Sequence, residues 1–404
     1  MQLLRNPVRP YAWGSRTTIA DLVGRPVPAP HPEAELWMGA HPGDPSWVGS
    51  ESLVAMLAAD PVGQLGAAVA ERWAGRLPFL MKVLAADEPL SMQAHPSAAQ
   101  AAEGYAREEK LGIARDASNR NYPDPTPKPE LLCALTEFHA LAGFRDPHRT
   151  VALLQAVTTP GLAPYVSLLA DDPNREGLRA LFTTWITLPQ PAIDALLPEL
   201  LDECVAHVKE HGEFELECRT VLELGEGYPG DAGVLAALLL NRLVLGPGEA
   251  IFLPAGNLHA YLRGTALEVL ANSDNVLRGG LTPKHVDVPE LLRVLDFGFG
   301  DMAATTGDPD GPRAIYRTSA PEFELCRMEW ATGERSPVKL AGGTPRILVC
   351  IDGELTVSSV DGRELPLRRG ESMWIPATDP DVALTPGDSP LVRAFAATVG
   401  TAAS

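Results

Sequence analysis

Side chains that bind metal ions recur at short spacing in this chain. Gln93 and His95 stand two residues apart, so in a strand both would lie on one face. Lys128 and Glu130 repeat that spacing with an ammonium and a carboxylate. With His259, the residues Gln93, His95 and Glu130 offer two nitrogen and two oxygen donors, a set that Zn²⁺, Mn²⁺, Co²⁺ or Fe²⁺ accepts. Taken singly, each signal is weak, because a His before Pro is more often a turn residue and a Lys-x-Glu pair is more often solvated.

A polar segment, residues 268–284, carries further charged side chains close behind His259 in the sequence. Glu268 and Asp274 supply carboxylates, and Arg278 and Lys284 supply cations. Paired cations beside a candidate metal site favour an anionic substrate, since Arg binds phosphate through two parallel hydrogen bonds. The alternative for the same residues is a surface loop whose charges form salt bridges.

An internal repeat indicates the scaffold that would hold these residues. Gly248–Pro254 and Gly370–Pro376 share the frame G-E-x-x-x-[IL]-P, which predicts a turn, a strand and a second turn in each copy. The first copy runs on to His259 and matches the pattern G-x5-P-x-G-x2-H of the cupin superfamily, in which that His is a metal ligand. The second has Thr378 and Asp381 at the matching positions, so it resembles a cupin barrel without its metal. We expect two small barrels and one metal ion per chain.

The predicted elements form a strand-rich stretch, a helical stretch and a second strand-rich stretch. Between Asp146 and about Asn241 apolar residues recur at helical spacing, and strand and turn signals return beyond Leu245. In the first part the pattern predicts strands at 34–38 and 77–85 and helices at 51–75 and 97–116, with Ser97 as an N-cap. The expected fold class is mainly β, with two cupin-type (double-stranded β-helix, jelly-roll) barrels and an α-helical domain. The expected domains are residues 1–145 with 242–300 as the catalytic barrel with flanking helices, 146–241 as a helical insertion, and 301–404 as a degenerate barrel without metal.

Composition excludes several classes of protein. The 404 residues carry a formal net charge of −19, which is unsuited to nucleic acid or to an anionic membrane surface. The five cysteines are scattered, with no C-x-x-C pair, which argues against a disulfide framework and a Cys-rich zinc site. The longest apolar run, Val234 to Leu240, is far shorter than a membrane span. We expect a soluble, cytoplasmic protein and favour a monomer.

Ordered motifs over nearly the whole chain resemble those of type I mannose-6-phosphate isomerases, also called phosphomannose isomerases. They are Tyr11–Ser15, Glu35–Gly39, Leu77–Leu84, Gln93–Pro96, Lys128–Leu131, Leu253–Tyr261 and, most specific of all, Ser273–Lys284. One departure is Pro127, which stands where the family often has His before Lys-Pro-Glu. It does not affect a ligand. The C-terminal barrel is the least similar region, and no functional residue is carried over to it.

The resemblance implies a zinc-dependent aldose–ketose isomerase that interconverts mannose 6-phosphate and fructose 6-phosphate through a cis-enediol. It implies one Zn²⁺ per chain, held by the four ligands named above, with Arg278 as the catalytic-site arginine. The general base stays open among Lys128, Glu268, Lys82 and Asp274. The phosphosugar would be bound by Lys284 and Arg278, together with Lys82 and Ser91.

Two other functions are compatible with a cupin metal site. A cupin oxygenase or lyase would use a redox metal and, in the first case, consume O₂. A non-catalytic sugar-binding cupin would need no metal, so the complete ligand set argues against it. An isomerase assay with mannose 6-phosphate separates the three hypotheses.

Overall fold

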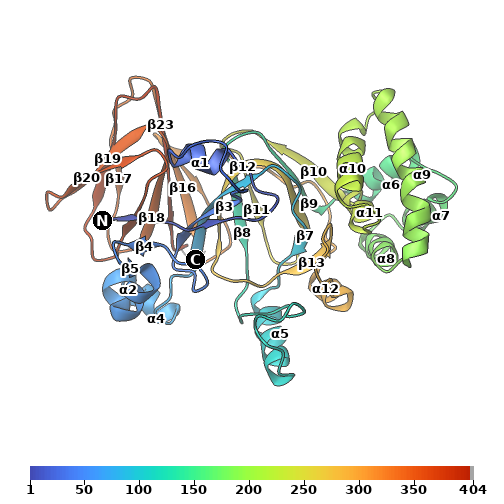
Figure 1. Cartoon of the computed structure of the whole chain (residues 1–404), viewed down its shortest axis with the longest axis horizontal. Coiled ribbons are helices and arrows are strands. Elements are labelled where there is room, and N and C mark those ends of the chain that lie inside the picture. Colours follow the sequence, from blue (N-terminus) through green and yellow to red (C-terminus); the bar gives the residue numbers. More distant parts are fainter. Residues whose placement is uncertain (401–404) are drawn as a thin grey trace.

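The longest fully buried strand among residues 1–400 lies beside the longest strand of the fold. β6 (Phe79–Ala86) pairs antiparallel with the second half of β12 (His259–Ala271). Both runs are apolar apart from the paired Lys82 and Glu268, which allows burial on both faces, as β6 shows along its whole length. The computed structural model describes residues 1–400, and in it these strands form the middle of a ten-stranded sheet (Figure 1).

β12 changes partners near its middle. Its first residues pair with β7 (Met92–Ala94) and β9 (Phe138–Phe144), and its last ones with β6 and β8 (Glu130–Ala134). The change falls at Gly264, which has φ +121°, and a Cβ there would lie 2.5 Å from the carbonyl oxygen of Glu137. Only glycine fits this bend. The bend brings both halves of β12 around one interior. The remaining strands of this sheet are β2 (Val8–Arg9), β3 (Glu35–Gly39), β10 (Leu240–Leu245), β11 (Ala250–Leu253) and β13 (Leu277–Gly280).

Two further sheets make up the C-terminal strand-rich part. One has seven strands, in the order β1 (Gln2–Leu4), β21 (Ser372–Ile375), β18 (Arg346–Asp352), β23 (Leu391–Thr398), β16 (Glu324–Ala331), β15 (Arg313–Tyr316) and β14 (Asp308–Asp310). The other is β17 (Val338–Leu340), β22 (Val382–Pro386), β19 (Glu354–Ser359) and β20 (Glu364–Arg368). Both copies of the repeated frame are strands, β11 and β21. The N-terminal β1 pairs with β21, so the two ends of the chain share a sheet.

Helices fill the stretch for which the sequence predicts them. Asp146 caps α6 through the backbone N–H groups of His148 and Arg149, and a buried cluster including Phe182 and Trp185 packs the helices together. They lie at one end of the molecule (Figure 1). They are α6 (Pro147–Ala156), α7 (Ala163–Ala170), α8 (Arg175–Ile186), α9 (Gln190–Lys209), α10 (Glu215–Gly227) and α11 (Gly233–Ala237). The mainly β fold class with a helical part is confirmed, whereas the two barrels and the three-domain division stay predictions.

The helix predicted at 51–75 is three short helices. Asp60 ends the first and caps the second through the N–H of Gly63, and Gly66, with φ +81°, separates the second from the third. The predicted N-cap Ser97 is confirmed, with a full capping box to Gln100. These and the other short elements are α1 (Thr18–Leu22), β4 (Trp47–Val48), β5 (Glu51–Ser52), α2 (Leu53–Ala59), α3 (Pro61–Leu65), α4 (Ala67–Arg72), α5 (Ala98–Lys110) and α12 (Val288–Val294).

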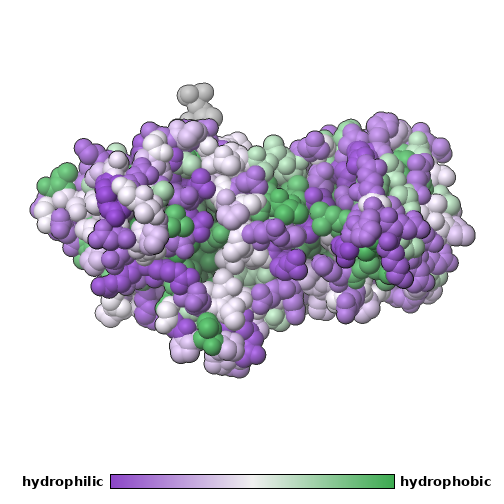
Figure 2. All heavy atoms as spheres, turned by 90° about the horizontal axis from the view of Figure 1, so that it is seen from above, coloured by the Kyte–Doolittle hydropathy of each residue, from purple (hydrophilic) through white to green (hydrophobic). Residues whose placement is uncertain are grey.

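The surface is mixed in character. Seen from above, hydrophilic residues cover much of the helical end, and apolar residues gather in patches between it and the strand-rich part (Figure 2). Among residues 1–400 there is no helix with the length and apolar character needed to cross a membrane.

Candidate active site

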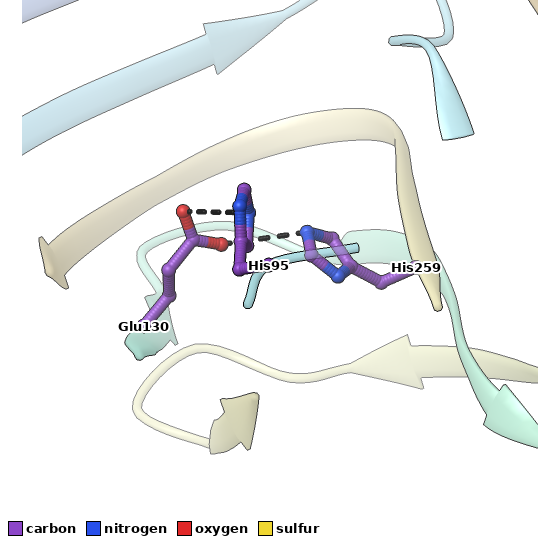
Figure 3. A group of neighbouring side chains, drawn as sticks. All are labelled: His95, Glu130 and His259. Carbon is purple, nitrogen blue, oxygen red and sulfur yellow. Dashed lines mark ion pairs between the residues drawn. The ribbon is translucent and has the colours of Figure 1, made fainter. Parts of the chain in front are cut away.

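Three predicted ligands meet in the interior of the ten-stranded sheet. Ligand atoms of His95, Glu130 and His259 lie within 4.8 Å of one another, and all three residues are buried. Nε2 of His95 lies 3.2 Å from Oε1 of Glu130, and Nε2 of His259 lies 3.4 Å from Oε2. Each carboxylate oxygen of Glu130 therefore faces one imidazole (Figure 3).

The strand register explains why residues so far apart in sequence meet. Glu130 opens β8, opposite Leu270 of β12. His259 opens β12, directly opposite Gln93 of β7, and His95 follows β7 at once. One long strand thus connects the strands that carry the other ligands.

Backbone carbonyls fix both imidazoles. Nδ1 of His95 donates to the carbonyl oxygen of Asn275 at 2.8 Å, and Nδ1 of His259 donates to that of Asn257 at 3.1 Å. A carbonyl only accepts, so Nδ1 carries the proton and Nε2 keeps a lone pair directed at the cluster. Nε2 of His95 is buried without a hydrogen-bond partner among the described residues, because in this tautomer it has no proton to donate to Glu130. A metal ion at the cluster would satisfy that lone pair.

Gln93 completes the predicted set from the adjacent wall. It lines a cavity of about 50 Å³ together with Glu130 and His259. Its amide nitrogen donates to Oγ of Ser91 at 3.2 Å, which leaves the amide oxygen available as a ligand. The donor set of two imidazoles, a carboxylate and an amide oxygen fits Zn²⁺.

The protonation states suit a metal site. Burial alone would raise the pKa of Glu130, but His95 and Lys128 outweigh it and hold the pKa well below its usual range. Burial lowers the pKa of His95 to about 4, against the opposing effect of Glu130. Glu130 is therefore an anion and His95 a neutral ligand near pH 7.

A second layer of charge lines the same cavity. Nζ of Lys82 lies 3.6 Å from Oε1 of Glu35 and 3.5 Å from Oε2 of Glu268, and all three residues are buried. Nζ of Lys128 lies 3.0 Å from Oε1 of Glu130. Because Lys82 and Glu268 are direct cross-strand partners, this pairing follows from the register of β6 and β12.

These contacts also set the ionisation of the second layer. Burial opposes the charge on Lys82, but Glu35 and Glu268 outweigh it and raise its pKa, so the ammonium persists. Burial and the nearby Glu130 raise the pKa of Glu268. Tyr261 donates to Oε1 of Glu268 at 2.8 Å, and burial and that carboxylate raise the pKa of the phenol well above its usual range.

Three residues of the site have no role in the sequence-based prediction. Glu35, Trp37 and Tyr261 all belong to the quoted motifs, yet nothing in their spacing assigned them chemistry. The indole of Trp37 donates to Oε2 of Glu35 at 2.7 Å, and Nζ of Lys82 lies 5.2 Å from the centre of its ring. Glu35 and Tyr261 line the cavity itself. No local sequence signal identifies Glu35, because its approach to Lys82 depends on the pairing of β3 with β6.

Of the other predicted residues, three lie outside the cavity lining and four belong to it. Arg278 stands on β13 directly opposite Gln93, half-buried, and its guanidinium has no hydrogen bond or ion pair within residues 1–400. Oδ1 of Asp274 lies 3.3 Å from Nε2 of His41. Lys284 is exposed, beyond the end of β13. Lys82, Lys128, Glu268 and Ser91 line the cavity with the ligands.

Comparison with known proteins yields one consistent family. A family model of the catalytic domain of phosphomannose isomerase type I matches residues 1–147. Over 405 residues the chain is 38% identical to the mannose-6-phosphate isomerase of Escherichia coli, with 98% of this chain and 99% of the relative covered. The human mannose-6-phosphate isomerase is 31% identical, with 92% of each chain covered.

Solved structures of this family superpose on nearly the full length of this chain. A crystal structure of mannose 6-phosphate isomerase bound with zinc and yttrium superposes with a TM-score of 0.87 at 37% identity, covering 99% of this chain and 100% of that one. The apo form from Salmonella typhimurium gives the same TM-score and identity, with 99% of each chain covered.

Proposed function

The chain belongs to the type I phosphomannose isomerase family of aldose–ketose isomerases, and from that premise we propose a zinc-assisted proton transfer between C1 and C2 of an open-chain hexose 6-phosphate. The reaction links D-mannose 6-phosphate to D-fructose 6-phosphate through a cis-enediol. The observation that carries the proposal is the buried His95–Glu130–His259 cluster, with its orphaned imidazole nitrogen, beside a cavity lined by two lysines and two further glutamates.

Gln93, His95, Glu130 and His259 would hold the metal. Zn²⁺ bound there would supply a Lewis acid to the sugar oxygens at C1 and C2. The carbonyls of Asn275 and Asn257 keep both imidazoles in the tautomer that a metal needs. One ion per chain is expected, because within the part of the chain that the structure describes these residues form the single cluster of three or more His, Cys, Asp or Glu ligands.

Proton transfer falls to residues that line the cavity. Lys82 keeps its proton between Glu35 and Glu268, so it serves as a fixed positive charge that binds a sugar oxygen. Lys128 and Glu268 remain as the groups that move the proton, and Asp274 is less suited because it pairs with His41 outside the cavity lining. A buried carboxylate with a raised pKa is a stronger base than one in water.

Arg278 would stabilise the negative charge that develops on the enediol oxygens. Its guanidinium lies on the strand opposite Gln93 and has no carboxylate partner in residues 1–400, so its charge is free to act on a substrate. Ser91 lines the cavity and Lys284 stands exposed, and we propose both, with Lys82 and Arg278, as phosphosugar contacts.

A coupled assay of fructose 6-phosphate formation from mannose 6-phosphate tests this function. Activity should vanish on chelation and return with zinc under anaerobic conditions. Full activity of metal-free protein would refute the metal proposal. Absence of turnover by the zinc-loaded protein, with sugar binding retained, would favour a binding protein, and O₂ consumption with Fe²⁺ would favour an oxygenase.

A further inference from the structure

A second and much larger cavity shares no lining residue with the cavity at the metal cluster. It encloses about 800 Å³, within the usual size range of ligand pockets. Its walls come from α2, the segment that follows α4, and the loops at 123–127 and 271–274. α2 and α4 lie together below the strands in Figure 1.

One wall of this cavity is flat and apolar. Leu57, Leu77 and Pro78 are buried residues that line it, and Trp73 lies beside them. Pro123 and Pro127 form part of the facing loop. Apolar and aromatic walls of this kind stabilise a flat ring rather than a polyhydroxylated chain, because the ring faces remove apolar surface from water.

Three arginines line the same cavity, although the chain as a whole is strongly acidic. Arg72, Arg76 and Arg115 all line it. Arg72 lies over the Trp73 ring, 5.2 Å from its centre, and neither Arg72 nor Arg76 has a hydrogen-bonded or ionic side-chain partner anywhere in residues 1–400. Arginines without carboxylate partners at a concave site favour a phosphate or carboxylate ligand.

The acidic side chains of the lining form no ion pair with Arg72 or Arg76 in residues 1–400. Asp274 pairs with His41, and Asp124 accepts hydrogen bonds from Ser273 and from the backbone of Asp274. Glu322 is buried, and burial raises the pKa of its carboxyl group, although the charge of Arg72 opposes that effect. Neither arginine forms an ion pair with these carboxylates, so both guanidinium groups remain available to a ligand.

Unsatisfied polar atoms concentrate in residues of this lining. Nine buried side-chain polar atoms lack a hydrogen-bond partner in the described chain, and three of them belong to this cavity: Nε1 of Trp73, Oδ1 of Asn272 and Oε2 of Glu322. Buried polar groups are normally paired, and those left unpaired require an explanation. A ligand that bears both N–H and carbonyl groups offers partners to such a mixed set of donors and acceptors.

We propose that this cavity is a binding site for a mononucleotide, distinct from the cavity at the metal cluster although Asp274, a candidate base, lies in its wall. Arg72 and Arg76 bind the phosphate, the Trp73 wall packs against the base, and the base edge supplies hydrogen-bond donors and acceptors. A sugar phosphate would match the arginines but leave the apolar wall uncovered. The occupant would also contact the loop that precedes Lys128.

Calorimetric titration of the zinc-loaded protein with GMP and AMP, in the presence of saturating mannose 6-phosphate, tests the proposal. Saturable binding of at least one nucleotide should persist with the isomerase substrate present. Guanosine, adenosine and inorganic phosphate, each titrated alone, should bind at least tenfold more weakly, because each engages only part of the site. Absence of saturable nucleotide binding, or its displacement by mannose 6-phosphate, would overturn the proposal.

A double variant, Arg72→Ala with Arg76→Ala, should weaken nucleotide binding at least tenfold and leave isomerase activity unchanged. Arg179→Ala is the matched control, since Arg179 also stands over an aromatic ring, that of Phe297 at 5.8 Å, but outside this cavity. Trp73→Phe should remove the quenching of tryptophan fluorescence by the nucleotide. Equal affinity in the parent and the double variant would show that any binding is located elsewhere.

Discussion

Asn275 connects the metal site to the loop that carries Lys128, and its replacement by Ala should weaken zinc binding without removing a ligand. The side chain is fully buried. Its Nδ2 donates to the carbonyl oxygens of Asp124 at 2.8 Å and Thr126 at 2.7 Å, and its backbone carbonyl accepts from His95. The same residue therefore positions a ligand and the segment that leads to Lys128.

The expected losses of folding stability and zinc affinity follow from these bonds. Asn275→Ala removes two short hydrogen bonds to half-buried carbonyls, of which that of Thr126 keeps only a longer bond from Ser273 at 3.3 Å, and this costs about 1–3 kcal/mol of stability. The variant keeps the backbone carbonyl that accepts from His95 but loses the side-chain bonds that hold its segment in place, and disturbing a group that orients a metal ligand typically lowers metal affinity about 10–100-fold. We expect zinc affinity to fall within that range, and kcat to fall even at saturating zinc because Lys128 is no longer held against Glu130.

Zinc affinity by competition with a chelator, and thermal unfolding of the metal-free protein, measure the two effects separately. Asn174→Ala is the control: it removes the N-cap of α8, with bonds of 2.8 and 3.1 Å, at the helical end. It should cost about 1 kcal/mol and leave zinc affinity unchanged. If Asn275→Ala lowers stability but binds zinc like the parent, the positioning role is refuted.

Four further substitutions test single roles. His259→Ala should lower zinc affinity by orders of magnitude while the sheets stay folded, and zinc content and activity equal to the parent would show that the ligand assignment is wrong. Arg278→Lys should depress kcat about 10²-fold with metal content unchanged, since the planar fork is lost, whereas an effect on KM alone would leave Arg278 a phosphate contact only. Glu268→Gln and Lys128→Met should each slow exchange of the C2 hydrogen with solvent at least 10²-fold in single turnovers. If one variant exchanges this hydrogen at the normal rate, the residue replaced in it is not the base.

Local sequence patterns predict many of the secondary-structure elements at nearly the correct residues. The strands at β3 and β6, the cap at Ser97 and the helices beyond Asp146 all follow from side-chain periodicity and capping, which act over a few residues. The break of residues 51–75 into three helices was missed because apolar spacing outweighed Asp60 and Gly66. A cap followed by Pro61 was the available signal for that break.

The pairing and register of strands far apart in the chain could not be predicted from the sequence. The contacts of Lys82 with Glu35 and Glu268 depend on which strands pair, and β12 pairs with four strands by bending at Gly264. Spacing within one segment says nothing of such neighbours. Gln93 and His95 could be predicted together because their spacing is that of one strand face, and His259 because its motif recurs in a known superfamily.

Titration of the metal-free protein with zinc, followed by the isomerase assay, tests the central claim most directly. Activity on mannose 6-phosphate should rise in proportion to added zinc and reach its plateau at one ion per chain, and Glu130→Gln should abolish the rise. A plateau at two ions, or full activity before any zinc is added, would contradict the account.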